Sequence, residues 1–459
     1  MVLKEAKRPF QTSEVKDLQM VTTMASLITW VCLLHIFTMI WNYDMAAGDP
    51  VLLHRPFITV WNAPSQECQE KYNISLDLGI FDVVLNQNES FVGRKMTLFY
   101  SNRLGYYPYY TENGTAVYGG APQNASLKEH LWKAQQDINE TILEENFRGL
   151  AVVDWERWRP LWVRNWGPME IYKNKSVDLV KKQHPDWPID KIVKEAQLEF
   201  EQSSRAFMEQ TLALGKILRP KGFWGFYGFP SCYNYERSYA NYTGECPEIE
   251  KLRNEELQWL WNQSRALYPS IYLPKDLRLF NKTLEFVRHR VQEAFRMVNR
   301  TGNGSTPVLP YACIAYEFTQ SFLPQEDLVH TIGESASQGA AGIILWGSKN
   351  YSCSQEACLD VKKYVDTVLG QYIINVTSST RLCSQIVCSG HGRCVRQDGH
   401  PDAFLHLSSA SFTIKKDPME PGFVVMGQMS KEEQVKMAEE FKCQCYSGWE
   451  GLRCAEKGN

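Results

Sequence analysis

The stretch Gly149–Pro160, GLAVVDWERWRP, contains a short apolar run that is followed at once by two carboxylates. The run GLAVV is typical of a buried β-strand, because a strand that is covered on both faces is apolar throughout. Asp154 and Glu156 stand two residues apart, so their side chains project to the same face. The stretch therefore predicts a buried strand with a carboxylate pair at its C-terminal end.

Further apolar, β-rich runs alternate with helical patterns from about Arg55 to Val376. Strands and helices in regular alternation predict a parallel sheet. About seven such units favour a (β/α) barrel over an open sheet, and in a barrel the chemistry lies at the C-terminal ends of the strands. The expected strands are Phe57–Trp61, Met96–Tyr100, Leu150–Val153, Phe223–Phe226, Ser270–Leu273, Val308–Ala312 and Gly342–Trp346.

The longest helix is expected over 189–218, where apolar residues recur at spacings of three, four or seven. Asp186 and Pro188 supply its start. Shorter helices are expected over 127–142, 284–298 and 361–368.

The composition excludes several classes of protein. The chain has 459 residues, of which 44% are hydrophobic and 22% charged, so it is neither disordered nor a multi-span membrane protein. The net charge of −3 excludes a globally basic nucleic-acid binder. Aromatic residues make up 12%, which suits the stacking of sugar rings but equally suits a large core.

The N-terminal residues 1–47 are predicted to be a signal peptide or a signal anchor. The apolar segment Val21–Trp41 follows a basic segment, and Ala46, Ala47 and Gly48 offer a cleavage site. A bilayer is spanned by ~20 residues, so an uncleaved anchor stays open, and the membrane is a partner only in that case.

Sequons and cysteines indicate an oxidising lumen. All cysteines except Cys32 lie at or after Cys68, and glycosylation sequons are frequent. The chain is therefore expected in the secretory pathway, in the lysosome or outside the cell. The ending EKGN has no hydrophobic tail, which argues against a GPI anchor. The sequons begin at Asn73, Asn88, Asn113, Asn124, Asn139, Asn174, Asn241, Asn262, Asn281, Asn299, Asn303, Asn350 and Asn375.

From Cys383 onward the spacing of cysteines predicts a disulfide framework. Six cysteines allow 15 connectivities, and spacing alone does not choose among them. A zinc site is the alternative, which secretion and the absence of C-x2-C pairs disfavour. The six are Cys383, Cys388, Cys394, Cys443, Cys445 and Cys454.

The carboxylate pair fits the chemistry of glycoside hydrolysis. Two carboxylates this close repel each other, so one is expected to keep its proton, as protonation of a glycosidic oxygen requires. The alternative is a solvated acidic turn that caps the next helix. Polar aromatics at the ends of other predicted strands favour the site, because in a barrel they would converge at one mouth, as is typical of sugar binding. They are Tyr100, Tyr227, Tyr272, Tyr311 and Trp346.

Nine segments together resemble the animal hyaluronidase family, glycoside hydrolase family 56, which is shared by bee venom and the mammalian lysosomal and sperm-surface enzymes. They are ITVWNAP, FYSNRLGYYPYY, GGAPQNASL, GLAVVDWERWRP, NWG, HPDWP, RPKGFWGFYGFPSCYNY, ALYPSIY and IGESASQGAAGIILWG. The resemblance runs from about Arg55 to Cys454, and it is greatest to the soluble lysosomal or plasma-type branch.

The resemblance implies the architecture. It implies a distorted (β/α) barrel over 48–378, followed by a disulfide-rich EGF-like module over 379–459. The gap Val395–Lys442 is too long for a compact EGF module, so an inserted loop or subdomain is expected there.

The resemblance also implies the reaction, which is hydrolysis of the β-1,4 bond after N-acetylglucosamine in hyaluronan, with retention. The substrate's own N-acetyl oxygen attacks the anomeric carbon, so no protein nucleophile is needed. The protein is expected to act as a monomer, without a cofactor, a metal ion or nucleic acid.

By resemblance, Glu156 is the general acid and later the base, and Asp154 shares a hydrogen bond with it and orients the acetamido group. Tyr227 and Tyr272 contact that group and stabilise the oxazolinium-like intermediate. Trp346 walls the N-acetyl pocket. Groove positions match Asn62, Tyr100, Arg159, Ser270 and Tyr311, although Arg159 could instead be a structural ion-pair partner.

Ser231 departs from the family pattern FPDCYN, which has an acidic residue before the cysteine. The loss of a carboxylate beside the groove is expected to lower repulsion of a polyanion. It also removes a hydrogen bond that could set the pH profile, so activity is more in doubt than fold.

The resemblance implies five disulfides. Cys313 and Cys353 are left over, and a sixth bridge between them would constrain the barrel mouth, since Cys313 shares a strand face with Tyr311. The implied pairs are Cys68–Cys358, Cys232–Cys246, Cys383–Cys394, Cys388–Cys443 and Cys445–Cys454.

Two other functions stay open. One is a catalytically weak hyaluronan-binding or adhesion protein, which the intact carboxylates and tyrosines disfavour. The other is a hydrolase that prefers chondroitin, which Tyr272 disfavours.

Overall fold

The computed structural model describes residues 49–85, 91–235, 241–279, 282–302, 306–417 and 421–458. The predicted signal segment, with its cleavage site and Cys32, lies outside these residues, as do the sequons at Asn88, Asn281 and Asn303. No helix within the described ranges is long and apolar enough to span a bilayer.

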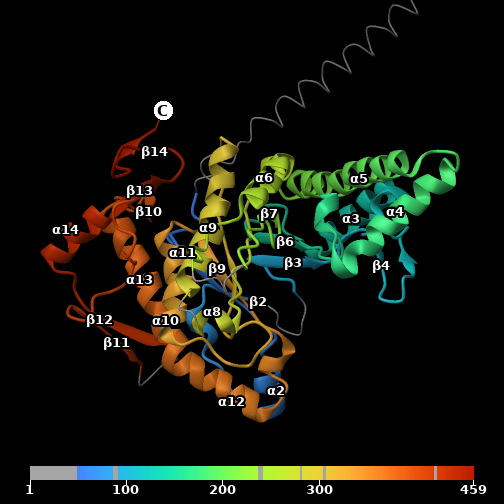
Figure 1. Ribbon diagram of the computed structural model, residues 1–459. Coiled ribbons are helices and arrows are strands. Elements are labelled where there is room, and N and C mark those ends of the chain that lie inside the picture. Colours follow the sequence, from blue (N-terminus) through green and yellow to red (C-terminus); the bar gives the residue numbers. More distant parts are fainter. Residues whose placement is uncertain are drawn as a thin grey trace, which may run out of the picture. The chain divides into compact units, whose positions relative to one another are not determined.

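Parallel strands follow one another around a distorted barrel in the order of the sequence (Figure 1). One sheet has the order β2-β1-β9-β8 and the other the order β3-β6-β7. Single bridges from Tyr268 to Tyr227 and from Ser270 to Tyr311 connect the two sheets. The described residues form no ladder between β2 and β3, so the barrel is interrupted there. The strands are β1 Ile58–Asn62, β2 Val83–Leu85, β3 Met96–Tyr100, β6 Leu150–Asp154, β7 Phe223–Phe226, β8 Tyr311–Cys313 and β9 Gly342–Trp346.

Alternation along each strand divides the core into an inner and an outer part. In β6, Leu150 and Val152 belong to the apolar cluster inside the barrel. Ala151 and Val153 belong to the cluster between the strands and the helices. Asp154 lies two residues after Val152, so its side chain also points into the barrel. The strand therefore places a carboxylate at one end of the barrel interior.

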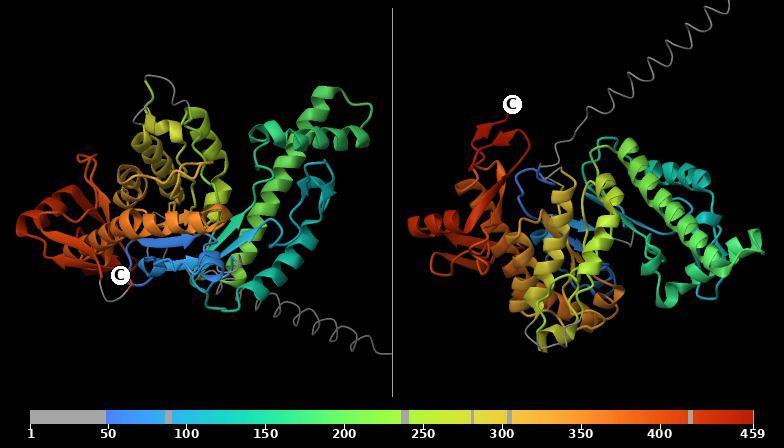
Figure 2. Two further views of the ribbon diagram at one scale, coloured as in Figure 1. Left: turned by 90° about the horizontal axis from the view of Figure 1, so that it is seen from below. Right: turned by 45° about the horizontal axis from the view of Figure 1, so that its top comes forward.

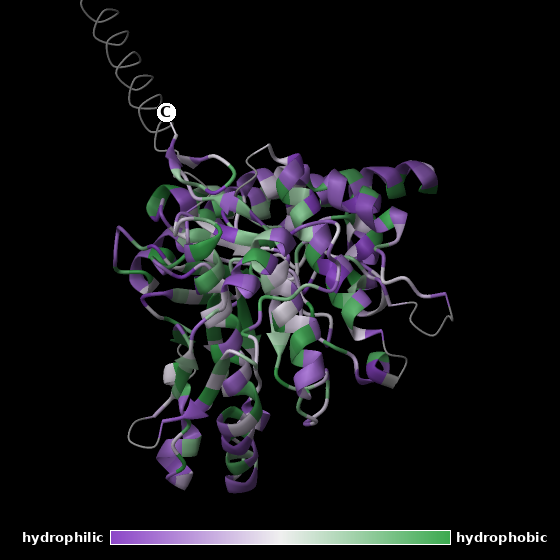
Figure 3. Ribbon diagram, turned by 90° about the vertical axis from the view of Figure 1, so that its left-hand side faces the viewer, coloured by the Kyte–Doolittle hydropathy of each residue, from purple (hydrophilic) through white to green (hydrophobic). Residues whose placement is uncertain are grey.

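The long helix α5 begins and ends as its spacing predicts, at Ile189 and Leu218. Its buried face includes Ala196, Phe200 and Phe207, whereas Ile189 at its first turn is 59% exposed. Near its end, Gly215 packs directly against the indole of Trp224. Hydrophilic and hydrophobic residues alternate along the outer helices, as expected for helices with one buried face (Figure 3).

The other helices have the following bounds: α2 Glu67–Tyr72, α3 Leu127–Thr141, α4 Glu170–Gln183, α6 Glu248–Glu256, α7 Gln258–Gln263, α8 Lys275–Leu279, α9 Thr283–Arg300, α10 Gln325–Leu328, α11 Glu334–Ser337, α12 Gln355–Tyr364 and α13 Gly370–Ile386. The predicted helix 361–368 is part of α12 and of the π-helix Val365–Leu369 that joins α12 to α13.

Two of the predicted strands are absent or shorter in the structure, because prolines interrupt them. Instead of a strand over Ser270–Leu273, the chain makes isolated bridges at Leu267, Tyr268 and Ser270. Pro269 lies among them and has no N–H to continue a ladder. Pro310 likewise interrupts the predicted strand Val308–Ala312, so β8 begins only at Tyr311.

The C-terminal segment contains two short antiparallel hairpins, a further strand pair and a helix. The long gap between its cysteines holds the hairpin β11–β12 and the helix α14, whose Ser430 and Glu433 form a capping box. The bounds are β10 Gly392–Arg396, β11 Phe412–Lys416, β12 Phe423–Gly427, α14 Lys431–Glu440, β13 Phe441–Cys445, β14 Trp449–Glu450 and β15 Glu456–Lys457.

This segment is built onto the barrel rather than separated from it by a linker. Helix α13 runs through residue 379, where the module was predicted to begin, and packs on β11 and β12 (Figure 2). Arg393 donates to the carbonyl of Pro56 at 2.8 Å, and Arg396 pairs with the buried Glu334 at 2.5 Å. The five disulfides of the structure are Cys68–Cys358, Cys232–Cys246, Cys383–Cys394, Cys388–Cys443 and Cys445–Cys454.

Candidate active site

The last inward-facing residues of the strands are polar or aromatic, whereas the inward residues before them are apolar. Tyr100 lies beside Asp154 in the register of β3 and β6. Trp346 lies beside Cys313 in the register of β9 and β8. Because the strands are parallel, all these side chains meet at the C-terminal end of the barrel.

A cleft of about 860 Å³ opens at this end. This volume is typical of a ligand-binding pocket. It is lined by ten of the eleven predicted catalytic and substrate-binding residues: Glu156, Asp154, Tyr227, Tyr272, Trp346, Tyr100, Arg159, Ser270, Tyr311 and Ser231.

Asn62 is the exception, and its prediction as a groove residue is corrected. It ends β1 between Leu85 and Trp346 and has no exposed surface. Its side-chain amide has no hydrogen-bond partner among the described residues. A fully buried amide cannot contact a substrate in the cleft.

The carboxylate pair is asymmetric. The Glu156 side chain is 57% exposed at the cleft, whereas Asp154 is largely buried at the end of β6. Burial, and then the negative charge of Glu156, raise the pKa of the Asp154 carboxyl, and Arg159 only partly offsets this. The proton that one member of the pair is predicted to keep is therefore held on Asp154.

Trp155 lies between the two carboxylates and anchors the turn. It points away from the cleft, is 4% exposed, and stacks on Tyr107 with ring centroids 4.6 Å apart. Trp158 also stacks on Tyr107, and its indole N–H donates to the carbonyl of Pro108 at 2.8 Å. These buried contacts hold Asp154 and Glu156 toward the cleft.

Arg159 is held beside Glu156 by the loop that follows. Its Nη1 donates to the Glu156 carbonyl at 2.9 Å, and its Nη2 lies 3.7 Å from the Glu156 carboxylate. Asn165, in the NWG segment, accepts from the Arg159 backbone N–H and donates to its carbonyl, both at 2.9 Å. These bonds hold the Arg159 guanidinium beside Glu156 at the edge of the cleft.

Three tyrosines and a tryptophan form the aromatic wall of the cleft. Tyr227 lies edge-on to Tyr311 at 4.9 Å, and Tyr272 stacks on Trp346 at 6.1 Å. The Tyr227 hydroxyl is hydrogen-bonded to Tyr272 and Ser270, and burial raises its pKa. Burial also raises the pKa of Tyr100 to about 12. These hydroxyls are therefore neutral donors over the working range of any hydrolase.

Ser231 lies in the loop that continues β7 into the cleft wall. The Phe229–Pro230 bond is cis, and Gly228 has φ +79°, a conformation that favours glycine. The Ser231 hydroxyl donates to the Gly228 carbonyl at 3.2 Å, and Asn254 donates to the Ser231 carbonyl at 2.7 Å. The side chain that replaces the family's acid thus borders the cleft.

The loop after β8, which forms one rim of the cleft, was not among the predicted site segments. Its members Tyr316–Gln320 line the cleft, and Phe318 is 98% exposed with φ +58°. An aromatic residue in that region of φ is an outlier. Loops after barrel strands border the mouth of the barrel. The position of this segment directly after a predicted strand could therefore have predicted that it lines the cleft. Arg290 from α9 also lines the cleft, and no signal in the sequence marked it.

The sixth disulfide that the sequence left open is not formed between Cys313 and Cys353. Cys313 and Cys353 are both free thiols. Cys313 lines the cleft with Tyr311, as their shared strand face predicts, and burial raises its pKa. Cys353 is exposed, and its thiol donates to the carbonyl of Asn350, so the two sulfurs have different surroundings.

Within the described ranges, no group of three or more His, Cys, Asp or Glu side chains could hold a metal ion. The cleft itself brings together two carboxyl groups, Asp154 and Glu156, and several tyrosine hydroxyls in an aromatic setting.

The family model that matches this chain and the curated relatives named below are all described as hyaluronidases. The family model described as Hyaluronidase, glycoside hydrolase family 56, matches residues 46–458. Hyaluronidase-1 of Homo sapiens is 50% identical over 436 residues, which are 95% of this chain and 99% of the relative. Hyaluronidase-1 of Sus scrofa is 49% identical over 435 residues, 95% of this chain and 100% of the relative.

A solved structure of bee venom hyaluronidase in complex with a hyaluronic acid tetramer is also similar. It has a TM-score of 0.62 and 30% sequence identity, and the match covers 69% of this chain and 98% of that chain.

Proposed function

The chain belongs to the hyaluronidase family, glycoside hydrolase family 56, and on that premise we propose that it hydrolyses the β-1,4 bond after N-acetylglucosamine in hyaluronan, with retention. The observation that carries the proposal is the asymmetric pair, in which a largely buried Asp154, whose pKa burial raises, adjoins an exposed Glu156 in the cleft.

In the first step, the N-acetyl oxygen of the substrate forms a bond to its own anomeric carbon, and the glycosidic C–O bond breaks. Glu156 gives a proton to the departing oxygen. Asp154 holds that proton in the free protein, so it must pass to Glu156 first. An acetamido N–H that approaches Asp154 would favour the Asp154 carboxylate and so drive this transfer.

In the second step, Glu156 is a carboxylate and acts as the base. It takes a proton from water while the water oxygen bonds to the anomeric carbon and the oxazolinium ring opens. Arg159, 3.7 Å away, stabilises this charged state of Glu156. The neutral hydroxyls of Tyr227 and Tyr272 donate toward the intermediate.

Substrate rings are expected to lie along the aromatic wall. Trp346 stacked on Tyr272 bounds the N-acetyl pocket, and Tyr100, Ser270 and Tyr311 supply hydroxyls to the groove. We add Phe318 to this set, because its exposed ring at the rim offers an apolar face to a further sugar. Ser231 leaves this wall without an added negative charge, which suits a polyanionic substrate.

The setting of the protein belongs to the same proposal. Five disulfides support an oxidising compartment, so we place the chain in the secretory pathway, in the lysosome or outside the cell. We propose that it acts as a monomer and that residues from 379 form an EGF-like module with an insertion. A competition assay against hyaluronan would rank chondroitin as an alternative substrate.

The test is the loss of hyaluronan size between about pH 3.5 and 7.5 for the wild type and for Glu156→Gln. Removal of the general acid is expected to lower kcat by about 10²–10⁴-fold without loss of binding. Glu140→Gln, on the exposed face of α3, is the matched control. If neither the wild type nor the variant cuts but both bind hyaluronan, the chain is a binding protein instead.

A further inference from the structure

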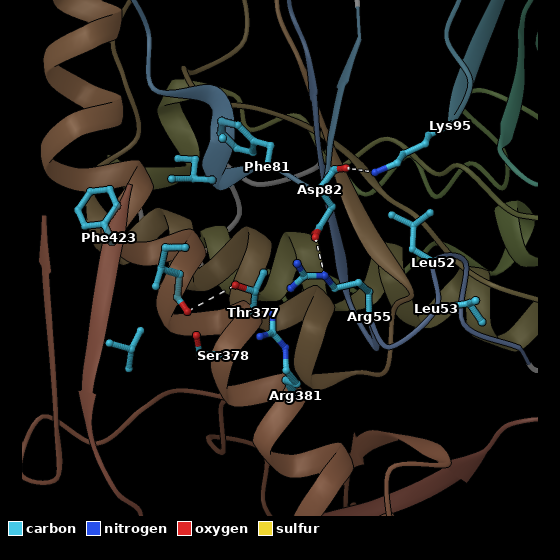
Figure 4. A pocket seen from close by; sticks show the side chains of 14 residues that line it. Leu52, Leu53, Arg55, Phe81, Asp82, Lys95, Thr377, Ser378, Arg381 and Phe423 are labelled. Carbon is cyan, nitrogen blue, oxygen red and sulfur yellow. Dashed lines mark hydrogen bonds and ion pairs between the residues drawn. The ribbon is translucent and has the colours of Figure 1, made fainter. Parts of the chain in front are cut away.

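A second cavity, of about 610 Å³, lies at the N-terminal ends of the barrel strands, opposite the cleft. Figure 4 shows the side chains that line it. Arg55, Asp82 and Lys95 line it, and each precedes one of the first three strands, at their N-terminal ends. Its other wall comes from α13 and β12 of the C-terminal part of the chain. None of these residues takes part in the proposed hydrolysis.

The cavity carries more positive charge than its own carboxylate neutralises. Both oxygens of Asp82 are occupied, one by Arg55 Nε at 3.0 Å and the other by the Thr59 backbone N–H at 2.9 Å. Within the described segments, the Lys95 ammonium donates to the Asp82 carbonyl alone, at 3.0 Å. Arg55 uses its Nε in this pair, and its two terminal nitrogens have no partner among the described residues.

Arg381 adds a third cation from α13. It is half-buried, and it has no hydrogen bond or ion pair within the described part of the chain. Figure 4 shows its guanidinium and that of Arg55 directed into the same space, near the hydroxyl of Ser378. Two guanidinium groups in one cavity repel each other unless an anion lies between them, and their planar forks fit a carboxylate or a sulfate.

The walls suit a ligand larger than a simple ion. Phe81 and Phe423 lie on one side in Figure 4, and Leu52 and Leu53 lie on the other. Pockets of this size that combine apolar walls with a few converging polar groups bind small organic ligands. We propose that this cavity binds an acidic saccharide, whose carboxylate or sulfate lies between Arg55 and Arg381.

If these cations had a purely structural role, Arg381 would be expected to have an acceptor within the protein. A brace between the barrel and the C-terminal part would pair Arg381 with an acceptor, as Arg396 is paired with Glu334. The absence of such a partner for Arg381 in the described ranges favours a site that completes its pairing with a ligand.

The test is a calorimetric titration of the full chain carrying Glu156→Gln, so that the ligand is not consumed. Hyaluronan hexasaccharide, a sulfated chondroitin tetrasaccharide and inorganic sulfate are titrated separately. We expect one saccharide to occupy a site that Arg381→Gln weakens at least about tenfold, with an affinity that falls as salt rises. For hyaluronan this site would be additional to the cleft. Hyaluronan carries carboxylates alone, whereas the sulfated chondroitin carries both groups. Binding of both saccharides therefore indicates that a carboxylate is recognised, and binding of the sulfated chondroitin alone favours a sulfate.

The matched control is Arg94→Gln, which removes the same charge beside Lys95 but outside the cavity. Lys95→Met is a second, independent variant if Arg381→Gln lowers the melting temperature. The proposal is overturned if neither variant changes the binding of either saccharide, or if inorganic sulfate binds as tightly as the saccharides. Because binding is measured without turnover, a chain that does not hydrolyse hyaluronan would still give a readable result.

Discussion

Asp154 shows how one residue couples the chemistry to stability. Its pKa is raised by burial and by Glu156, so the folded state binds this proton more tightly than the unfolded chain, whose aspartate pKa is about 4. Stability from this group is therefore present at low pH and is lost as pH rises from about 4 through neutrality.

Asp154→Asn removes this pH dependence, because an amide does not titrate. We expect the melting temperature of the wild type to fall more between pH 4.5 and 7.5 than that of the variant, while the variant loses most of its activity. Thermal unfolding at the two pH values measures this difference. An equal fall in both proteins would contradict the raised pKa.

Phe318 is the second residue whose position has a measurable consequence. Its hairpin is held by hydrogen bonds from Thr319 N to the Tyr316 carbonyl and from Tyr316 N to the Ser321 carbonyl, each 3.0 Å long. Phe318→Ala is expected to raise KM for polymeric hyaluronan by about 2- to 10-fold with little change in kcat, since one stacking contact is lost.

Phe318→Gly distinguishes the effect of the ring on binding from the effect of the positive φ on stability. Glycine accepts a positive φ, so this variant should raise KM as Phe318→Ala does while gaining up to about 1 kcal/mol of stability over it. Phe318→Tyr, which keeps the ring, should keep the wild-type KM. A wild-type KM in Phe318→Ala would show that the ring does not contact the substrate.

At the scale of elements, hydrophobic periodicity predicted where most strands and the long helix lie. Met96–Tyr100, Phe223–Phe226 and Gly342–Trp346 agree with the structure residue for residue, because apolar runs bounded by polar residues leave little freedom of register. The short strand β2 was missed, since three residues carry too little periodicity. Asn62 was misplaced, because a strand pattern does not tell which terminal residue is buried by its neighbours.

Gly215 tests how α5 packs on the barrel. A Cβ at this position would lie 2.7 Å from ring atoms of Trp224. Alanine is the better helix former by about 1 kcal/mol, yet we expect Gly215→Ala to destabilise the protein by about 1–3 kcal/mol, because overpacking outweighs propensity. Chemical denaturation measures the change, with Gly399→Ala as the control, since a Cβ there meets no atom within 4 Å. A stabilised Gly215→Ala variant would mean that α5 and β7 are less tightly packed.

At the scale of the whole molecule, one buried carboxylate joins the C-terminal segment to the barrel. Glu334 in α11 has no exposed side-chain surface and accepts from Arg288 of α9 at 2.9 Å and from Arg396 of β10 at 2.5 Å. Burial alone would raise the pKa of Glu334, but the hydrogen bonds from Arg396 and Arg288 outweigh it and the pKa is lowered. The stability that this ion pair provides is therefore fully present above the pH at which a glutamate usually titrates. It is lost only as the pH falls through the lowered pKa of Glu334.

Glu334→Gln leaves the partly buried guanidinium groups of Arg288 and Arg396 without their shared counter-charge. The loss of one partner of a buried ion pair costs about 3–5 kcal/mol, and we expect this loss in the free energy of unfolding at pH 7. Glu356→Gln, at the exposed start of α12, is the control and should change little. Since Glu334 remains charged in mild acid, the difference between Glu334→Gln and the wild type should persist at pH 5. A difference that vanishes at that pH would show that Glu334 is already protonated there, and that the barrel and the C-terminal segment are held together by their apolar contacts instead.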